Sequence, residues 1–128
     1  GIWEGIPSPD GTVFAARSQA GWSIHPISGT AEGRPVPSLD QTHYLIRWSP
    51  DGKALYYFQR GSIPAAVDRV DIATGRHETI ATIGENERAG LVSILSVSLG
   101  DDMRSLVYGG WNYTSVLYTV APAKQPGK

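Results

Sequence analysis

The sequence predicts an all-β fold made of repeated antiparallel sheets, and three observations lead to this prediction. The turn motif Ser-Pro-Asp-Gly occurs at 8–11 and again at 49–52, each time followed by an alternating apolar run. The 128 residues include 15 glycines and 9 prolines, placed between short apolar stretches, as expected of many strands joined by turns. No segment has the apolar spacing of a helix.

Each position of the turn motif has a physical explanation. Proline presets the backbone dihedral of the second turn position, aspartate tolerates the third, and glycine takes the left-handed conformation that closes the turn. The aspartate carboxylates are expected to accept backbone N–H hydrogen bonds within their own turns. The residues assigned to these structural turns are Ser8, Pro9, Asp10, Gly11, Ser49, Pro50, Asp51 and Gly52.

The strands follow in order along three units. The first unit continues from its turn into a strand at 12–18, and the middle unit reads as strands at 43–48, 54–59, 66–72 and 77–83. A third unit contains a degraded turn around Ser98, in which Leu99 replaces proline and Gly-Asp-Asp at 100–102 replaces Asp-Gly, with an insertion. After the strand at 115–120 only a Pro/Lys-rich tail remains.

The spacing of the turns predicts the architecture. The motif serines are separated by 49 − 8 = 41 residues and then by 98 − 49 = 49 residues. Four antiparallel strands repeated at this period are typical of β-propeller blades. We therefore expect about three blades, at 1–42, 43–90 and 91–120, with the last blade lacking its outer strand and with a flexible tail at 121–128.

The turns and the strands after them carry a family resemblance. The segments "WSPDGKALYY" and "VDRVDIATG" resemble the WD40-like (PD40, TolB-type) β-propeller repeat. The segment 94–120 resembles the closing blade of propellers found C-terminal to bacterial Ser/Thr protein kinases and in related sensor proteins. The resemblance implies a regulatory, non-catalytic module with an extracytoplasmic or periplasmic location. The kinase would lie elsewhere, since the chain has no H-R-D or D-F-G motif.

Composition excludes several classes of partner and cofactor. Eleven basic and 12 acidic residues give a net charge of −1, without a basic cluster that could bind nucleic acid. No apolar stretch reaches the length of about 18 residues that a membrane span needs. The chain has no cysteine, and its three histidines are isolated in the sequence. We therefore expect neither a metal site nor a cofactor.

One segment invites an enzymatic interpretation. "GWSIHP" at 21–26 begins like the nucleophile elbow of prolyl-oligopeptidase-type hydrolases, but the elbow needs small residues after its serine, whereas Ile24 and His25 follow Ser23 here. Ser23 is therefore assigned to a strand, and no catalytic residue is predicted. Two alternatives to a sensing module stay open: the substrate-gating propeller of an oligopeptidase-like hydrolase, and an excised or engineered assembly scaffold.

A binding site is expected on loops at one end of the blades. Alternate connections of an antiparallel sheet emerge on the same side, so the loops 17–22, 60–65 and 109–114 share a rim with 38–43 and 84–90. Arginine and aromatic residues are enriched at binding hot spots, although the aromatic residues could instead cap the blade ends. The candidates for contact with a protein or peptide ligand are Arg17, Trp22, Arg60, Trp111, Asn112 and Tyr113.

The blade count also predicts association. A propeller needs roughly four to eight blades to close its ring and protect its sheet edges, and about three are found here. Two copies would supply six blades. The sequence therefore predicts either a homodimeric six-bladed ring or assembly with the remainder of a parent propeller.

Overall fold

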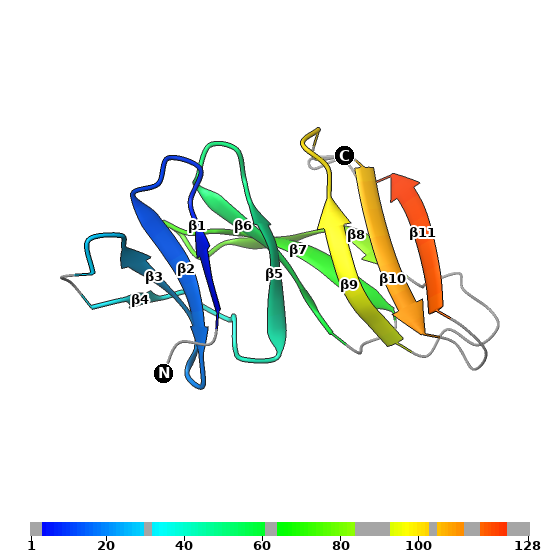
Figure 1. Cartoon of the computed structure of the whole chain (residues 1–128), viewed down its shortest axis with the longest axis horizontal. Helices are drawn as coiled ribbons and strands as arrows, with labels where there is room; N and C mark the ends of the chain where they lie inside the picture. The colour runs from blue at the N-terminus through cyan, green and yellow to red at the C-terminus, as the bar shows by residue number, and fades with distance from the viewer. Residues whose placement is uncertain are drawn as a thin grey trace.

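The computed structural model describes residues 4–29, 32–60, 64–83, 93–102, 105–111 and 116–122, and in this part of the chain it contains strands and no helix. Three antiparallel sheets lie next to one another along the longest axis (Figure 1). Blade 1 comprises β1 (Glu4–Pro7), β2 (Val13–Ser18), β3 (Gly21–Pro26) and β4 (Arg34–Pro35). Blade 2 comprises β5 (His43–Trp48), β6 (Ala54–Gln59), β7 (Ala65–Asp71) and β8 (His77–Ile83). Blade 3 comprises β9 (Ser93–Leu99), β10 (Ser105–Trp111) and β11 (Val116–Pro122).

This architecture confirms the predicted fold class. Within each sheet the strands are ordered as they follow in the chain, and every pair is antiparallel. Blade 3 has three strands in the described part of the chain, as predicted for a blade without its outer strand. Strand β11 ends at Pro122, which pairs with Ser105. The predicted tail boundary at 121 is therefore two residues too early, and 123–128 lie outside the described residues.

The Ser-Pro-Asp-Gly turn of blade 2 is a closed hydrogen-bonded unit. Gly52 has a φ of 73°, and its N–H donates to the Ser49 carbonyl at 2.9 Å. The buried Ser49 hydroxyl donates to the Asp51 carboxylate at 2.6 Å and accepts the Ala54 N–H at 3.0 Å. Asp51 also accepts the Lys53 N–H at 3.0 Å. The hydrogen bond from the Ser49 hydroxyl is the largest cause that lowers the pKa of Asp51, and the bond from the Lys53 N–H is the next.

The turn of blade 1 repeats this arrangement. Gly11 has a φ of 74° and donates its N–H to the Ser8 carbonyl at 3.0 Å. Asp10 accepts the N–H of Thr12 at 3.0 Å and the Ser8 hydroxyl at 2.7 Å. The pKa of Asp10 is lowered, with the Thr12 backbone bond as the largest cause. The two turns thus use the same donors and acceptors 41 residues apart.

The third turn requires a correction. The N–H of Gly100 donates to the Ser105 carbonyl at 2.8 Å, as the N–H of Ser49 donates to that of Ala54. Gly100, and not Ser98, therefore occupies the serine position, the offset is 100 − 49 = 51 residues, and no insertion is present. Asp102 supplies the polar closure, because its carboxylate accepts the Ser105 N–H at 3.0 Å and the Ser105 hydroxyl at 2.9 Å.

Blade 2 is buried on both faces. One apolar cluster joins blades 1 and 2 and includes Trp22, Leu55 and Val70, and another joins blades 2 and 3 and includes Val67 and Leu106. Val67 and Val70 are three residues apart on β7, and they pack into different clusters on the two faces of blade 2. Burial of alternate side chains on both faces is what a blade between two neighbours requires.

Side chains on the first strands join the blades. The Trp48 indole N–H on β5 donates to the Ile6 carbonyl on β1 at 3.0 Å. Arg47 donates to the Leu99 carbonyl on β9 at 3.3 Å and to Asp101 at 2.9 Å. A register shift between Leu45 and Arg47 marks a β-bulge just before these donors. Figure 1 shows the consequence, with β1, β5 and β9 side by side as the first strands of the three blades.

Candidate functional site

The loop rim is the end of the blades opposite the Ser-Pro-Asp-Gly turns. Here it is defined by the β2–β3 turn, the link 36–42 from blade 1 to blade 2, and Arg60, which follows the end of β6. Figure 1 shows the β2–β3 turn and the link entering β5 at the same end of the molecule. This placement follows from the antiparallel order of the strands, since β2 and β6 run away from the turns and finish at the rim.

A hollow of about 500 Å³ opens on the loop rim between blades 1 and 2. The side chains that line it come from three separate parts of the sequence. They are Arg17, Gln41, Thr42, Tyr44 and Arg60. Two of the six residues predicted to bind a ligand, Arg17 and Arg60, therefore lie together here.

Two guanidinium groups converge on one aromatic ring in this hollow. The Arg17 guanidinium carbon lies 4.4 Å from the centroid of the Tyr44 ring, and that of Arg60 lies 5.5 Å from it. Both distances are within the range of cation–π attraction. Hydrogen bonds from Arg17 and then from Arg60 lower the pKa of the Tyr44 phenol. The hollow therefore favours negative charge on an oxygen atom.

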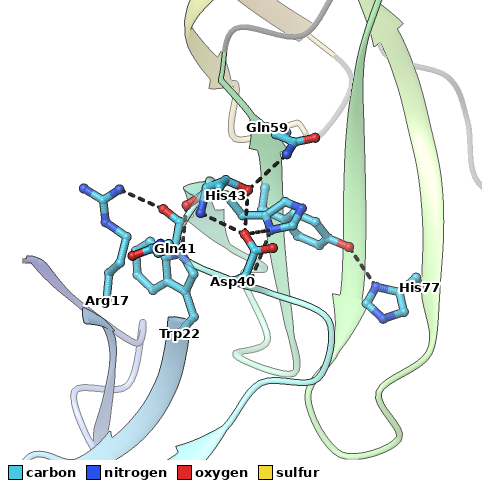
Figure 2. Close-up of polar contacts among 9 residues, drawn as sticks. Arg17, Trp22, Asp40, Gln41, His43, Gln59 and His77 are labelled. Carbon is cyan, nitrogen blue, oxygen red and sulfur yellow. Dashed lines mark hydrogen bonds and ion pairs between the residues drawn. The ribbon is translucent and has the colours of Figure 1, made fainter. Parts of the chain in front are cut away.

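The two arginines are not equivalent. Arg17 is half-buried and forms an ion pair with Glu4 at 3.3 Å, directly across the β1–β2 pair. It also donates to the Gln41 carbonyl at 3.5 Å (Figure 2). Arg60 is exposed, and no carboxylate among the described residues lies within ion-pair distance of it. Arg17 is the anchored cation of the hollow, and Arg60 is the cation available to a ligand.

Hydrogen bonds fix the link beside the hollow (Figure 2). The Asp40 carboxylate accepts the Thr42 N–H at 2.8 Å and the Thr42 hydroxyl at 2.5 Å, and these two bonds are the main reason that the pKa of Asp40 is lowered. Gln59 on β6 donates to the Thr42 hydroxyl oxygen at 3.0 Å. His43 lies 3.1 Å from Asp40. The wall of the hollow is thus held to both the link and blade 2.

Trp22 has a different role from the one proposed among the rim candidates. Its side chain is 2% exposed, and its indole N–H donates to the His43 carbonyl at 2.9 Å. Its own backbone bonds to Leu39 and Val36. Strand β3 already begins at Gly21, so Trp22 is a strand residue that points into the cluster between blades 1 and 2. It takes the packing role that the sequence left as the alternative.

The remaining rim candidates are placed less fully. Trp111 is the last residue of β10 and pairs with Val116 and Ser93. Asn112 and Tyr113 lie outside the described residues. Tyr44, in contrast, was not among the sequence candidates, because it reads as an ordinary strand residue. Its position one residue after the predicted rim loop 38–43 was the available signal.

The opposite end of the blades carries a second hollow, of about 410 Å³. It lies where β1, β5 and β9 end, and its lining is mostly apolar. The lining residues are Ile6, Pro7, Pro9, Ile46, Arg47, Trp48, Ser98, Leu99 and Asp101. Its one charged pair, Arg47 with Asp101, is already joined at 2.9 Å. Because the one charged pair of this hollow is already joined, the hollow on the loop rim, with its exposed Arg60, is the better candidate for ligand recognition.

The serine of the enzymatic interpretation lies in regular strand. Ser23 pairs with Ala16 in the middle of β3, and its hydroxyl lies 2.8 Å from the His25 ring nitrogen. The His25 ring in turn stacks on Phe14 with centroids 5.2 Å apart. Among the described residues, no three His, Asp or Glu side chains form a group that could hold a metal ion. Nor does this part of the chain contain a helix long and apolar enough to cross a membrane.

Comparison with known proteins identifies the fold. The chain matches no protein-family model and no curated protein sequence. It does match the solved structure of a putative TolB from Agrobacterium tumefaciens, with a TM-score of 0.65 and 20% identity over 91% of this chain and 40% of that one. TolB from Acinetobacter baumannii gives a TM-score of 0.50 and 17% identity over 92% of this chain and 29% of that one.

The likeness to these structures is a likeness of fold, that of the TolB-type β-propeller, at identities where fold alone carries over. The chain spans less than half of the length of either TolB structure. The three blades of the described residues form an arc of a propeller and not a closed ring.

Proposed function

We propose that the chain is part of a non-catalytic β-propeller module that binds a protein or peptide ligand through its loop rim. The observation that carries this proposal is the convergence of Arg17, Tyr44 and Arg60, from two blades, on one hollow at the rim. Strand side chains are committed to packing between blades, whereas rim residues are free to make contacts. Arginine and tyrosine are two of the residue types that dominate binding energy at protein interfaces.

The parent protein is proposed to be a bacterial signalling protein, such as a receptor-type Ser/Thr kinase with this propeller as its extracytoplasmic regulatory part. The support is the sequence resemblance of 94–120 to the closing blade of such propellers. In this proposal the ring is completed either by a second copy of the chain or by the remainder of the parent propeller. Ligand binding at the rim would then be passed to the signalling domain through the blades.

A displayed library of random peptides tests the rim proposal while the natural ligand is still unidentified. Peptides selected on the immobilised chain are synthesised, and their dissociation constants are measured by fluorescence polarisation. Arg60→Ala and Tyr44→Phe are expected to weaken binding by about fivefold or more, since hot-spot side chains contribute over about 1 kcal/mol. Lys53→Ala, which removes an exposed cation at the opposite end of blade 2, is the matched control.

Two results would contradict the proposal. One is a set of selected peptides that bind both rim variants as tightly as the original chain. The other is a loss of binding in Lys53→Ala with none in Arg60→Ala. Melting temperatures of all three variants are measured in parallel, so that a loss of binding is not confused with a loss of folding.

A further inference from the structure

The charge of the hollow on the loop rim points to the chemistry of its ligand. Its two cations are Arg17 and Arg60, and one anion, Glu4, is paired with Arg17 at 3.3 Å. The neighbouring Asp40 does not line the hollow, and its carboxylate contacts Thr42 and His43 and forms no ion pair with Arg60. One positive charge of the hollow therefore has no ion-pair partner among the described residues, and it is carried by the exposed side chain of Arg60.

The donors around this charge suit an oxygen anion. Arg60 presents a planar fork of N–H groups that matches a carboxylate in a two-point contact. The guanidinium groups of Arg17 and Arg60 lie against the Tyr44 ring and hydrogen-bond to its hydroxyl, which can still donate its own proton. The lowered pKa of this phenol reports the same preference for negative charge on oxygen at the same place. The side-chain amide of Gln41 adds a further donor at the edge.

We infer that the hollow binds a carboxylate of an acidic peptide segment, with Arg60 and Tyr44 contacting the carboxylate and Arg17 holding Tyr44 in place. This inference rests on the proposed function and specifies its ligand. A carboxylate is favoured over a phosphate group because it carries one negative charge, which matches the single cation of the hollow that has no ion-pair partner. A phosphate group carries nearly two. The carboxylate could belong to a glutamate or aspartate side chain or to a peptide C-terminus.

Nuclear magnetic resonance of the full chain tests the inference, with the arginine side-chain N–H signals and the Tyr44 ring signals as probes. The first titrant is a capped peptide, acetyl-Gly-Glu-Gly-amide, and the second is the same peptide with glutamine in place of glutamate. An uncapped triglycine peptide tests a C-terminal carboxylate, and inorganic phosphate tests the competing anion. We expect saturable shifts at Arg60 and Tyr44 with the glutamate peptide or with triglycine, and none with the glutamine peptide.

Variants separate the inferred contacts from general electrostatic attraction. Arg60→Gln should weaken binding of the carboxylate peptide about five- to tenfold, as expected for the loss of a charge-assisted contact. Arg60→Lys keeps the positive charge but not the planar fork of N–H groups. Its dissociation constant for the carboxylate peptide should therefore lie between those of the original chain and of Arg60→Gln. Arg76→Gln, which removes an exposed cation near the opposite end of blade 2, should change the dissociation constant by less than about twofold.

Three outcomes would overturn the inference: equal binding of the glutamine peptide, tighter binding of phosphate than of either carboxylate, or equal losses in Arg60→Gln and Arg76→Gln. Each of these can occur while peptides selected from the library still depend on Arg60 and Tyr44. In that case the rim remains a ligand site and only the carboxylate chemistry is wrong. If the library peptides are also insensitive to both rim residues, the proposed function fails as well.

Discussion

The buried hydroxyl of Ser49 is the most constrained polar group of the turns. It donates a hydrogen bond to the Asp51 carboxylate and accepts one from the Ala54 N–H. Ser49→Ala leaves that buried N–H without its acceptor, so the free energy of unfolding should fall by about 1–3 kcal/mol. Ser96→Ala, an exposed position on β9, is the control and should change it by less than about 0.5 kcal/mol. Equal effects in urea denaturation would show that the Ser49 hydroxyl does not close the turn.

The turn carboxylates should also make the stability of the folded chain depend on pH in the acidic range. The pKa values of Asp10, Asp51 and Asp71 are lowered by hydrogen bonds in the folded chain. Carboxylates with lowered folded pKa values contribute stability above their unfolded pKa of 3.8, and this stability is lost as the pH falls through the folded values. Stability should therefore decline below about pH 4. The double variant Asp10→Asn/Asp51→Asn should be less stable at neutral pH and should show a shallower acid decline, measured by urea denaturation at each pH.

Residue identity was enough to predict the two Ser-Pro-Asp-Gly turns and not the third. The segment 100–105 has lost the serine, the proline and the glycine of the motif, so only its hydrogen bond from Gly100 to Ser105 shows the equivalence. Only part of the candidate site on the loop rim could be found from the sequence, for a similar reason. Arg17 and Arg60 stand in loops by their sequence, but their common partner Tyr44 lies on a strand, and only the stacking of blade 1 on blade 2 brings the three together.

At the scale of the elements, two glycines with positive φ should respond differently to a methyl group. Gly52 has a φ of 73° and open space around it, with Pro9 at 3.9 Å from an added Cβ. Gly52→Ala should therefore lower the free energy of unfolding by the backbone strain alone, about 1–2 kcal/mol. Gly21 has a φ of 107°, and an added Cβ would lie 2.6 Å from the Leu39 carbonyl oxygen. Gly21→Ala should cost about 3 kcal/mol or more, because strain and overpacking add.

Thermal unfolding of the two variants beside Gly5→Ala gives the comparison. Gly5 lies in β1, where an added Cβ would make only an ordinary contact with Phe14 at 3.5 Å. Equal costs for Gly21→Ala and Gly52→Ala would mean that the link 36–40 does not pack against the start of β3 as described.

The strands themselves were the best predicted elements: those at 43–48, 54–59 and 77–83 have the expected bounds. Alternation and turn residues fix such boundaries locally, whereas contacts between sheets are not local.

At the scale of the whole molecule, the arc of three blades leaves the outward face of blade 3 without a neighbouring blade among the described residues. Val107 on β10 is 43% exposed there, while the next residues along the strand, Leu106 and Tyr108, are buried against blade 2. We expect the isolated chain to associate at micromolar concentration, giving twice its mass of 13.8 kDa in light scattering. Val107→Asp should favour the monomer, because it places a charge on the face that would be covered.

Ile27→Asp is the matched control for this experiment. Ile27 is 51% exposed in the turn after β3, away from the outward face of blade 3. It should leave the association unchanged. A well-folded monomer for the unmodified chain at micromolar concentration would contradict the self-association, and the ring would then be completed by the rest of a parent propeller.

The bonds that join the blades have a consequence for how this chain can change over evolution. Trp22, Trp48 and Arg47 each donate to a main-chain carbonyl of the neighbouring blade, at His43, Ile6 and Leu99. A carbonyl is present whatever residue bears it, so the neighbour's side chain at that position is free to be substituted. Duplicated blades can therefore diverge until their sequences are barely alignable and still dock, provided that each donor is retained. The contacts between the blades therefore constrain these two indole donors and one guanidinium donor more than the side chains of the residues that accept their bonds.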